Sequence, residues 1–231
     1  MKKVEHKPSK RYQEAIKLVD AKKVYSVDEA IALVKQTSTV KFDSGIDVHV
    51  KLTIDPRKGD QLVRSTVTLP HGNGRSVTVA VVTGDSDQQK AAKAAGAEIV
   101  GEKELIEEIK AGKATFDVLV ATPDAMKLLA PVAKILGPKG LMPNPKDGTV
   151  TQNIGEAVAQ LKKGKISYKN DDSANLHVLI GRASFTEQQL KENFQTIMDS
   201  ILKAKPAASK GTYIKSVSLA SSMGPGVKVA L

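Results

Sequence analysis

The hydrophobic pattern of this 231-residue sequence changes twice, near residue 70 and again near residue 154. Between these points, short apolar runs at 76–83, 98–100 and 116–121 alternate with segments of helical spacing at 88–95, 102–110 and 126–136. Such alternation is typical of a mostly parallel sheet covered by helices. We therefore predict a Rossmann-like, three-layer α/β domain over residues 70–154.

The two ends of the chain follow a different pattern. Residues 46–54 and 63–69 alternate apolar and polar side chains, as half-buried antiparallel strands do. Capping-box sequences at Ser26–Glu29 and Thr186–Gln189 predict two helices, and the spacing at 154–161 predicts a third. Further strands are predicted at 166–168, 176–180 and 212–219, and we expect the first two to pair across the turn at 170–175.

Neither end has enough elements to close a core alone, but together they can form an antiparallel sheet with helices on one face. We therefore predict an α+β outer domain made of residues 1–69 plus 155–231, with the α/β domain of residues 70–154 inserted in it. The fold class of the whole chain is then α/β. Two chain crossings with a small interface favour a hinge, predicted at Leu69, Pro70, His71, Gly72 and Gly74.

The excess positive charge lies in the same two ends. The chain has 35 basic and 25 acidic side chains, a net charge of +10. Residues 1–67 contribute +5 and residues 161–231 contribute +6, whereas residues 68–160 contribute −1. A charge that served solubility alone would be spread evenly. The distribution therefore indicates a polyanionic partner, and nucleic acid first of all, for the outer domain.

Several other classes of protein lack support in the sequence. There is no cysteine, no apolar run long enough to span a membrane and no secretory leader pattern, so we expect a cytoplasmic protein without disulfides. None of the four histidines stands at metal-ligand spacing, and no nucleophile elbow or acid–base arrangement is recognisable. We predict no metal, no cofactor and no enzymatic activity.

The α/β domain invites a nucleotide-binding interpretation, but the phosphate-binding motifs are missing. The turn after its first strand, Thr83–Asp87, carries two carboxylates that would repel a phosphate. The glycines of Gly72–Arg75 could cradle an anion, although a hinge needs them equally and we prefer the hinge. The stiff loop Gly137–Pro145 is interpreted as a helix stop and connector.

Three segments of the outer domain carry chemistry suited to RNA. Lys41 and Phe42 place a cation beside an aromatic face just before the first strand. Four lysines at positions 162, 163, 165 and 169 lead into the turn at 170–173. The stretch Ser221–Gly226 ends a strand with hydroxyls and with glycines that permit close backbone approach. Singly, each segment is more often plain surface or turn than a binding site.

These segments, together with Asp55-Pro56-Arg57-Lys58, Leu69-Pro70-His71-Gly72 and the Gly137–Pro145 loop, resemble the family of universal large-subunit ribosomal protein number one in its bacterial form. The resemblance extends over about residues 12–229. It implies that the discontinuous domain docks on a non-duplex junction of large-subunit (23S) ribosomal RNA at the mobile stalk near the exit site for tRNA. It also implies help in release of deacylated exit-site tRNA, repression of the protein's own operon mRNA, and a monomer when free of the subunit.

Carried over by position, the resemblance implies an RNA-contacting set at three places. These residues are Lys41, Phe42, Asp171, Asp172, Ser173, Ser222, Met223 and Gly224, to which we add Lys169. Two positions depart from the family's common pattern: Asp172 replaces a lysine, and Ser222 replaces a threonine. We expect Lys169 or Lys165 to compensate for the acidic Asp172, while Ser222 keeps the hydroxyl.

Two alternatives remain open at this point. One is an enzyme that uses a nucleotide on the α/β domain, and the other is a non-specific nucleic-acid-binding protein driven by charge. Specific binding to one folded RNA in the presence of competitor favours the ribosomal interpretation, whereas a steep salt dependence with little preference favours charge alone.

Overall fold

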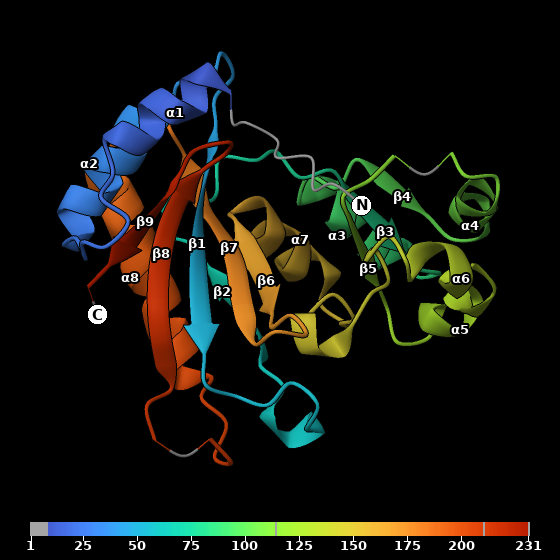
Figure 1. Cartoon of the computed structure of the whole chain (residues 1–231). Helices are drawn as coiled ribbons and strands as arrows, with labels where there is room; N and C mark the ends of the chain where they lie inside the picture. Colours follow the sequence, from blue (N-terminus) through green and yellow to red (C-terminus); the bar gives the residue numbers. More distant parts are fainter. Residues whose placement is uncertain (1–8, 114, 210, 231) are drawn as a thin grey trace, which may run out of the picture. The chain divides into compact units, whose positions relative to one another are not determined.

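The structure is a computed structural model that describes residues 9–113, 115–209 and 211–230, so the basic segment at residues 1–8 lies outside it. The chain divides into two compact units, drawn in Figure 1. Unit 1 takes its residues from Met1–Arg64, Leu69–Gly74 and Tyr168–Leu231. Unit 2 takes its residues from Ser65–Thr68 and Arg75–Ser167.

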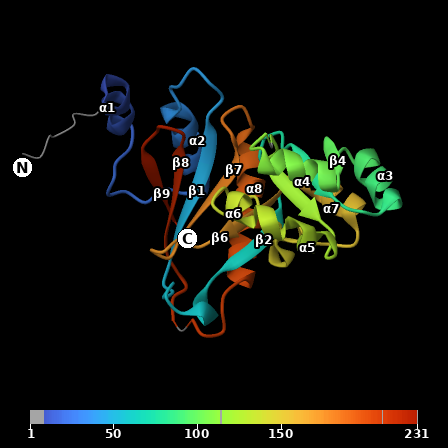
Figure 2. The ribbon, with the colours of Figure 1, turned by 90° about the vertical axis from the view of Figure 1, so that its right-hand side faces the viewer.

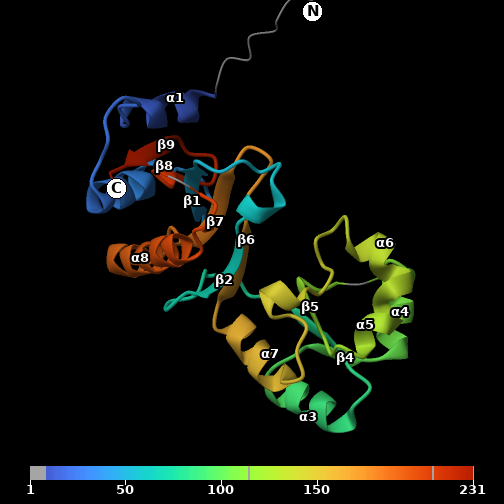
Figure 3. The ribbon, with the colours of Figure 1, turned by 90° about the horizontal axis from the view of Figure 1, so that it is seen from below.

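Unit 1 is built on a four-stranded antiparallel sheet with the order β7-β1-β8-β9. The strands are β1 (Gly45–Leu52), β7 (Asn175–Arg182), β8 (Ile214–Ser221) and β9 (Gly226–Val229). Helices α2 (Val27–Thr37) and α8 (Glu187–Lys203) pack on one face and contact β7, β8 and β9. Figure 3 shows the short helix α1 (Lys10–Lys17) on the other side of the strands, near β9.

Alternation along β1 explains which face is covered. Ile46, Val48 and Val50 are at most 1% exposed, and they point toward α2 and α8, whereas the residues between them face away. Figures 1 and 2 show β1 between β7 and β8, in the middle of the sheet. Both predicted capping boxes are confirmed, at the first residues of α2 and α8.

Unit 2 has three layers. Its parallel sheet, order β4-β3-β5, consists of β3 (Val79–Val82), β4 (Ile99–Gly101) and β5 (Val118–Ala121). Figure 3 shows α3 (Ser86–Ala94) and α7 (Ile154–Lys162) on one face, and α4 (Lys103–Lys110), α5 (Ala125–Leu129) and α6 (Ala133–Leu136) on the other. Each face has its own apolar core, because alternate β3 residues point to opposite sides. The predicted α/β fold class is confirmed.

Several details differ from the sequence-based expectation. The helix expected over 126–136 is broken into α5, the 3-10 turn η2 (Ala130–Val132) and α6, because Pro131 lacks the amide hydrogen that a continuous helix needs. Two further 3-10 turns are η1 (Gly59–Gln61) and η3 (Pro145–Asp147). Strand β9 was not predicted.

The expected pairing of residues 166–168 with 176–180 is wrong. Strand β6 (Lys165–Lys169) instead forms a separate two-stranded ladder with β2 (Arg64–Thr68), while β7 pairs with β1. The unit boundaries differ from those expected as well. Helix α7 belongs to unit 2 because Ile154, Val158 and Leu161 bury their apolar face against that unit's sheet and α3.

Candidate nucleic-acid interface

Five of the predicted RNA-contacting residues gather at the end of the unit 1 sheet where β1 begins and β8 ends. We call this group, made of Lys41, Phe42, Ser222, Met223 and Gly224, the Met223 cluster. The Ser222 amide donates a 2.9 Å hydrogen bond to the carbonyl oxygen of Gly45, which joins the two segments. Phe42 is 53% exposed and Met223 is 68% exposed, so two large apolar side chains face solvent beside a lysine.

A hydrogen-bonded frame fixes the loop that presents Phe42. The Asp43 carboxylate accepts hydrogen bonds from the amide and the hydroxyl of Ser184, at 3.1 and 2.8 Å. The guanidinium of Arg182 donates to the Asp43 carbonyl at 3.0 Å. The loop is therefore pinned to the end of β7, and the exposure of Phe42 is a feature of an ordered segment.

The turn that carries Met223 is strained. Met223 has φ of 60°, in the left-handed region that non-glycine residues rarely adopt. A Cβ on Gly224 would lie 2.2 Å from the Ser221 hydroxyl oxygen, so a larger residue there would force that buried side chain to move. Strain of this kind is often found where a binding surface must hold one side chain in place.

Arg11 on α1 contacts this cluster and was not among the residues predicted from the sequence. Its guanidinium donates a 3.3 Å hydrogen bond to the carbonyl oxygen of Met223, 212 positions away. The pattern of α1, with its single buried Ala15, gave no signal for this contact. Arg11 both supports the strained turn and adds a cation next to Met223.

The other four predicted residues form a second group around the turn between β6 and β7. We call this group, made of Lys169, Asp171, Asp172 and Ser173, the Asp171 cluster. The Asp171 carboxylate accepts hydrogen bonds from the Asn175 amide at 2.6 Å, the Asn175 side-chain amide at 3.0 Å and the Ser173 amide at 2.9 Å. These bonds, those from Asn175 first, lower the pKa of Asp171 to about 2.

The residues of the Asp171 cluster have different roles. Asp171 orders the turn, whereas Asp172 and Ser173 are exposed on it. Lys169 is exposed two residues before Asp171, but Lys165 donates to Gln160 in unit 2 at 3.0 Å. Of the two lysines expected to compensate for Asp172, Lys169 is therefore the one placed on unit 1.

The predicted residues thus lie at opposite ends of β1. Gly45, at the start of β1, contacts the Met223 cluster. Lys51, near the other end of the strand, contacts the Asp171 cluster, because its ammonium group donates to the Ser173 carbonyl. Six residue steps at the rise of an extended strand separate these ends by about 20 Å. The side chains of β1 between these ends that face away from α2 and α8 are Asp47, His49 and Lys51.

Comparison with known proteins gives the family. The sequence profile of the ribosomal protein L1p/L10e family matches residues 34–225. The chain is 53% identical over 223 residues to large ribosomal subunit protein uL1 of Chromobacterium violaceum, covering 96% of each chain. It is 52% identical to the uL1 protein of Neisseria meningitidis with the same coverage, and 53% identical to that of Laribacter hongkongensis, covering 96% of this chain and 95% of the relative.

The chain belongs to the ribosomal protein L1p/L10e family. The resemblance seen in the sequence is thereby confirmed. Members of the L1 family are structural ribosomal proteins and not enzymes, which removes the nucleotide-using enzyme from consideration.

The residues predicted as a hinge in this L1-family chain are anchored on unit 1. Asn193 of α8, which is fully buried, accepts from the His71 amide at 3.3 Å and donates to the Gly72 carbonyl at 2.9 Å. The His71 ring contacts Glu192 at 2.5 Å, which lowers the pKa of that carboxyl group. Gly72 and Gly74 have φ of 65° and 70°, so the segment needs its glycines for its backbone path.

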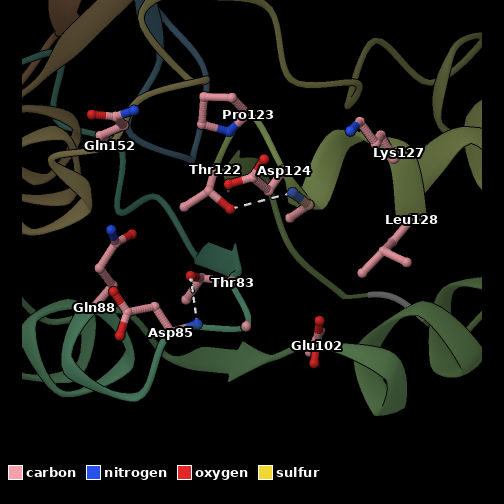
Figure 4. Close-up of a pocket in the computed structure, with 12 residues that line it drawn as sticks. Thr83, Asp85, Gln88, Glu102, Thr122, Pro123, Asp124, Lys127, Leu128 and Gln152 are labelled. Atoms are coloured by element: carbon pink, nitrogen blue, oxygen red, sulfur yellow. Dashed lines mark hydrogen bonds between the residues drawn. The ribbon is translucent and has the colours of Figure 1, made fainter.

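Unit 2 contains a cleft of about 590 Å³ at the carboxyl ends of β3 and β5. Figure 4 shows Asp85, Glu102 and Asp124 around it, with Lys127 at its rim. Ligands of open α/β sheets bind at this kind of place, but the carboxylates disfavour a phosphate. Among the described residues, no group of three or more acidic or histidine side chains is arranged to hold a metal ion.

None of the helices in the described ranges combines the length and apolar character that a bilayer crossing requires.

Proposed function

We propose that this chain is a structural constituent of the large ribosomal subunit in the cytoplasm, and that unit 1 binds folded large-subunit ribosomal RNA. The observation that carries the proposal is the Met223 cluster, where two exposed apolar side chains sit beside Lys41 and Arg11 on a hydrogen-bonded frame. RNA loops and junctions are recognised by such stacking surfaces, together with cations for phosphate and short polar groups for 2′-hydroxyls. The names of the uL1 relatives point the same way.

The finer proposal is that the RNA is a non-duplex junction of the stalk near the exit site. The two clusters, separated by about 20 Å, suit a folded RNA with two contact regions better than a single helix groove. Movement of such a stalk would accompany the release of deacylated tRNA. A similar fold in the protein's own operon mRNA would compete for the same surface and repress translation.

A hinge between the units is part of the proposal. Because Leu69–Gly74 is held by Asn193, the pivot lies beyond Gly74, on the side of Arg75. Distance measurements between one label on each unit, with and without RNA, test this point. A single fixed distance under all conditions would count against a hinge.

A protection experiment on large-subunit RNA tests the RNA partner. We expect the full-length protein to protect one junction, and to keep that protection in excess unrelated structured RNA at physiological salt. Protection that is scattered over many helices and falls steeply as the salt concentration rises would instead identify a binder driven by charge alone. Repression is tested by adding the protein to a translation reaction programmed with its own mRNA.

A further inference from the structure

Two histidines meet on the open face of the unit 1 sheet, between the two clusters. The side chains of β1 that face away from α2 and α8 are Asp47, His49 and Lys51. His49 lies opposite His177 on β7 and opposite Ser218 on β8, and Ser218 lies opposite Lys228 on β9. We call this line of four residues across the sheet the histidine row.

The two imidazole rings are hydrogen-bonded to each other. Their Nδ1 atoms are 2.7 Å apart, and the rings meet edge to face with centroids 4.9 Å apart. Only one proton fits between the two Nδ1 atoms, so the neutral pair has one ring that donates and one that accepts. The donor ring then has an unprotonated Nε2 atom.

A single added proton changes what this pair offers to a ligand. It binds at the free Nε2 atom and leaves the Nδ1 hydrogen bond intact. The pair then carries one positive charge and an Nε2–H group on each ring, of which that of His177 lies 3.6 Å from the Asp171 carboxylate. A second proton would require hydrogens on both Nδ1 atoms and would break the bond, so the pair takes up one proton and resists another.

The surroundings of the pair act on it in opposite directions. Burial, and next the neighbouring His177, lower the pKa of His49, while the carboxylate of Asp47 opposes this shift. On the turn beside β7, Asp171 lies 3.6 Å from the Nε2 atom of His177. The nearest cation along β1 is Lys51, and Lys228 lies at the far end of the row. Strand β8 contributes the uncharged hydroxyl of Ser218.

We propose that His49 and His177 form a phosphate-binding site that is loaded by one proton, and that RNA crossing the open face binds there. This inference rests on the proposed function. A backbone phosphate placed over the row favours the charged form of the pair, so binding is coupled to the uptake of a proton. RNA affinity therefore rises as the pH falls.

The test is RNA affinity as a function of pH, at constant ionic strength, with the full-length protein and the protected junction RNA. For one fully linked proton the dissociation constant changes tenfold per pH unit, so we expect binding at least about fivefold tighter at pH 6 than at pH 8. His49→Gln should lose most of this difference. His71→Gln, which removes a histidine from the segment anchored by Asn193, is the matched control and should keep it.

A direct readout accompanies the affinities. Nitrogen-15 spectra of the ring atoms report protonation of His49 and His177, and junction RNA should raise the pKa of the pair. Tight binding that is independent of pH, or equally dependent on pH in His49→Gln, would overturn the histidine inference and leave the proposed function standing. Absence of specific junction binding at every pH would instead remove the proposed function, and this inference with it.

Discussion

The guanidinium of Arg11 donates a 3.3 Å hydrogen bond to the backbone carbonyl of Met223. This contact joins the first described helix to the strained turn after β8, near opposite ends of the sequence. It makes α1 part of the candidate interface, and it explains how a left-handed methionine is held in position.

Removal of this contact should weaken RNA binding without unfolding the protein. We expect Arg11→Gln to reduce affinity for junction RNA roughly threefold to fivefold, about 0.6–1 kcal/mol, since a partly exposed charged hydrogen bond contributes little more. Lys17→Gln removes the same charge from the exposed end of α1 and is the control. Equal losses in both variants would show that general charge, and not the Met223 contact, is responsible.

Two substitutions of Met223 separate the effect of its backbone strain on stability from the effect of its side chain on RNA binding. Met223→Asp places a charge against desolvated RNA and should weaken specific binding at least tenfold, about 1.4 kcal/mol. Met223→Gly relieves the positive φ of 60° and should raise the free energy of unfolding by about 1 kcal/mol, yet weaken RNA binding by loss of the side chain. Both are measured by RNA titration and urea unfolding. Unchanged affinity in either folded variant removes Met223 from the site.

Asn193 should be the polar residue on which the Leu69–Gly74 segment depends. It is fully buried and its side chain contacts His71, Gly72 and the Ile180 carbonyl. Asn193→Ala leaves these backbone groups without partners, so we expect a loss of about 2–3 kcal/mol in the free energy of unfolding. Gln195→Ala, on the exposed side of the same helix, should change it by less than about 0.5 kcal/mol.

The unit boundaries predict which deletion preserves RNA binding. Replacement of residues 76–163 by a short flexible linker removes most of unit 2, including all of α7, and we expect RNA affinity within about threefold of the full chain. Replacement of residues 70–155 removes His71 and Gly72 and leaves most of α7 without its sheet, so it should unfold at lower denaturant. Equal stability of the two deletions would contradict these boundaries.

The buried hydroxyl of Tyr213 should lower the free energy of unfolding. The side chain is buried, its hydroxyl oxygen has no hydrogen-bond partner among the described residues, and burial raises the pKa of Tyr213 to about 12. Folding thus favours the neutral form of Tyr213. The free energy of unfolding therefore keeps its full value below the ordinary pKa of 10 and falls as the pH rises toward 12.

Tyr213→Phe removes both effects. We expect it to raise the free energy of unfolding by about 1 kcal/mol at pH 7 and to reduce the decline in stability between pH 10 and 12. Urea titrations across this range measure both quantities. Tyr12→Phe, at a half-buried position on α1, should leave them unchanged.

The sequence by itself determined the α/β class, most element positions and the concentration of positive charge in the terminal segments. These properties follow from local periodicity, capping residues and composition, which are readable along the chain. The capping box at Ser26 is an example, because all of its partners lie within four residues.

Only the tertiary structure decided how distant segments pair and where the candidate site lies. Residues 166–168 and 176–180 alternate like the two arms of a hairpin, yet β6 pairs with β2 and β7 with β1, because hydrophobic alternation specifies a buried face and not a partner. The contacts of Arg11 with Met223 and of His49 with His177 join residues 212 and 128 positions apart. Such contacts leave no periodic signal, since they arise from strand register and not from spacing along the chain.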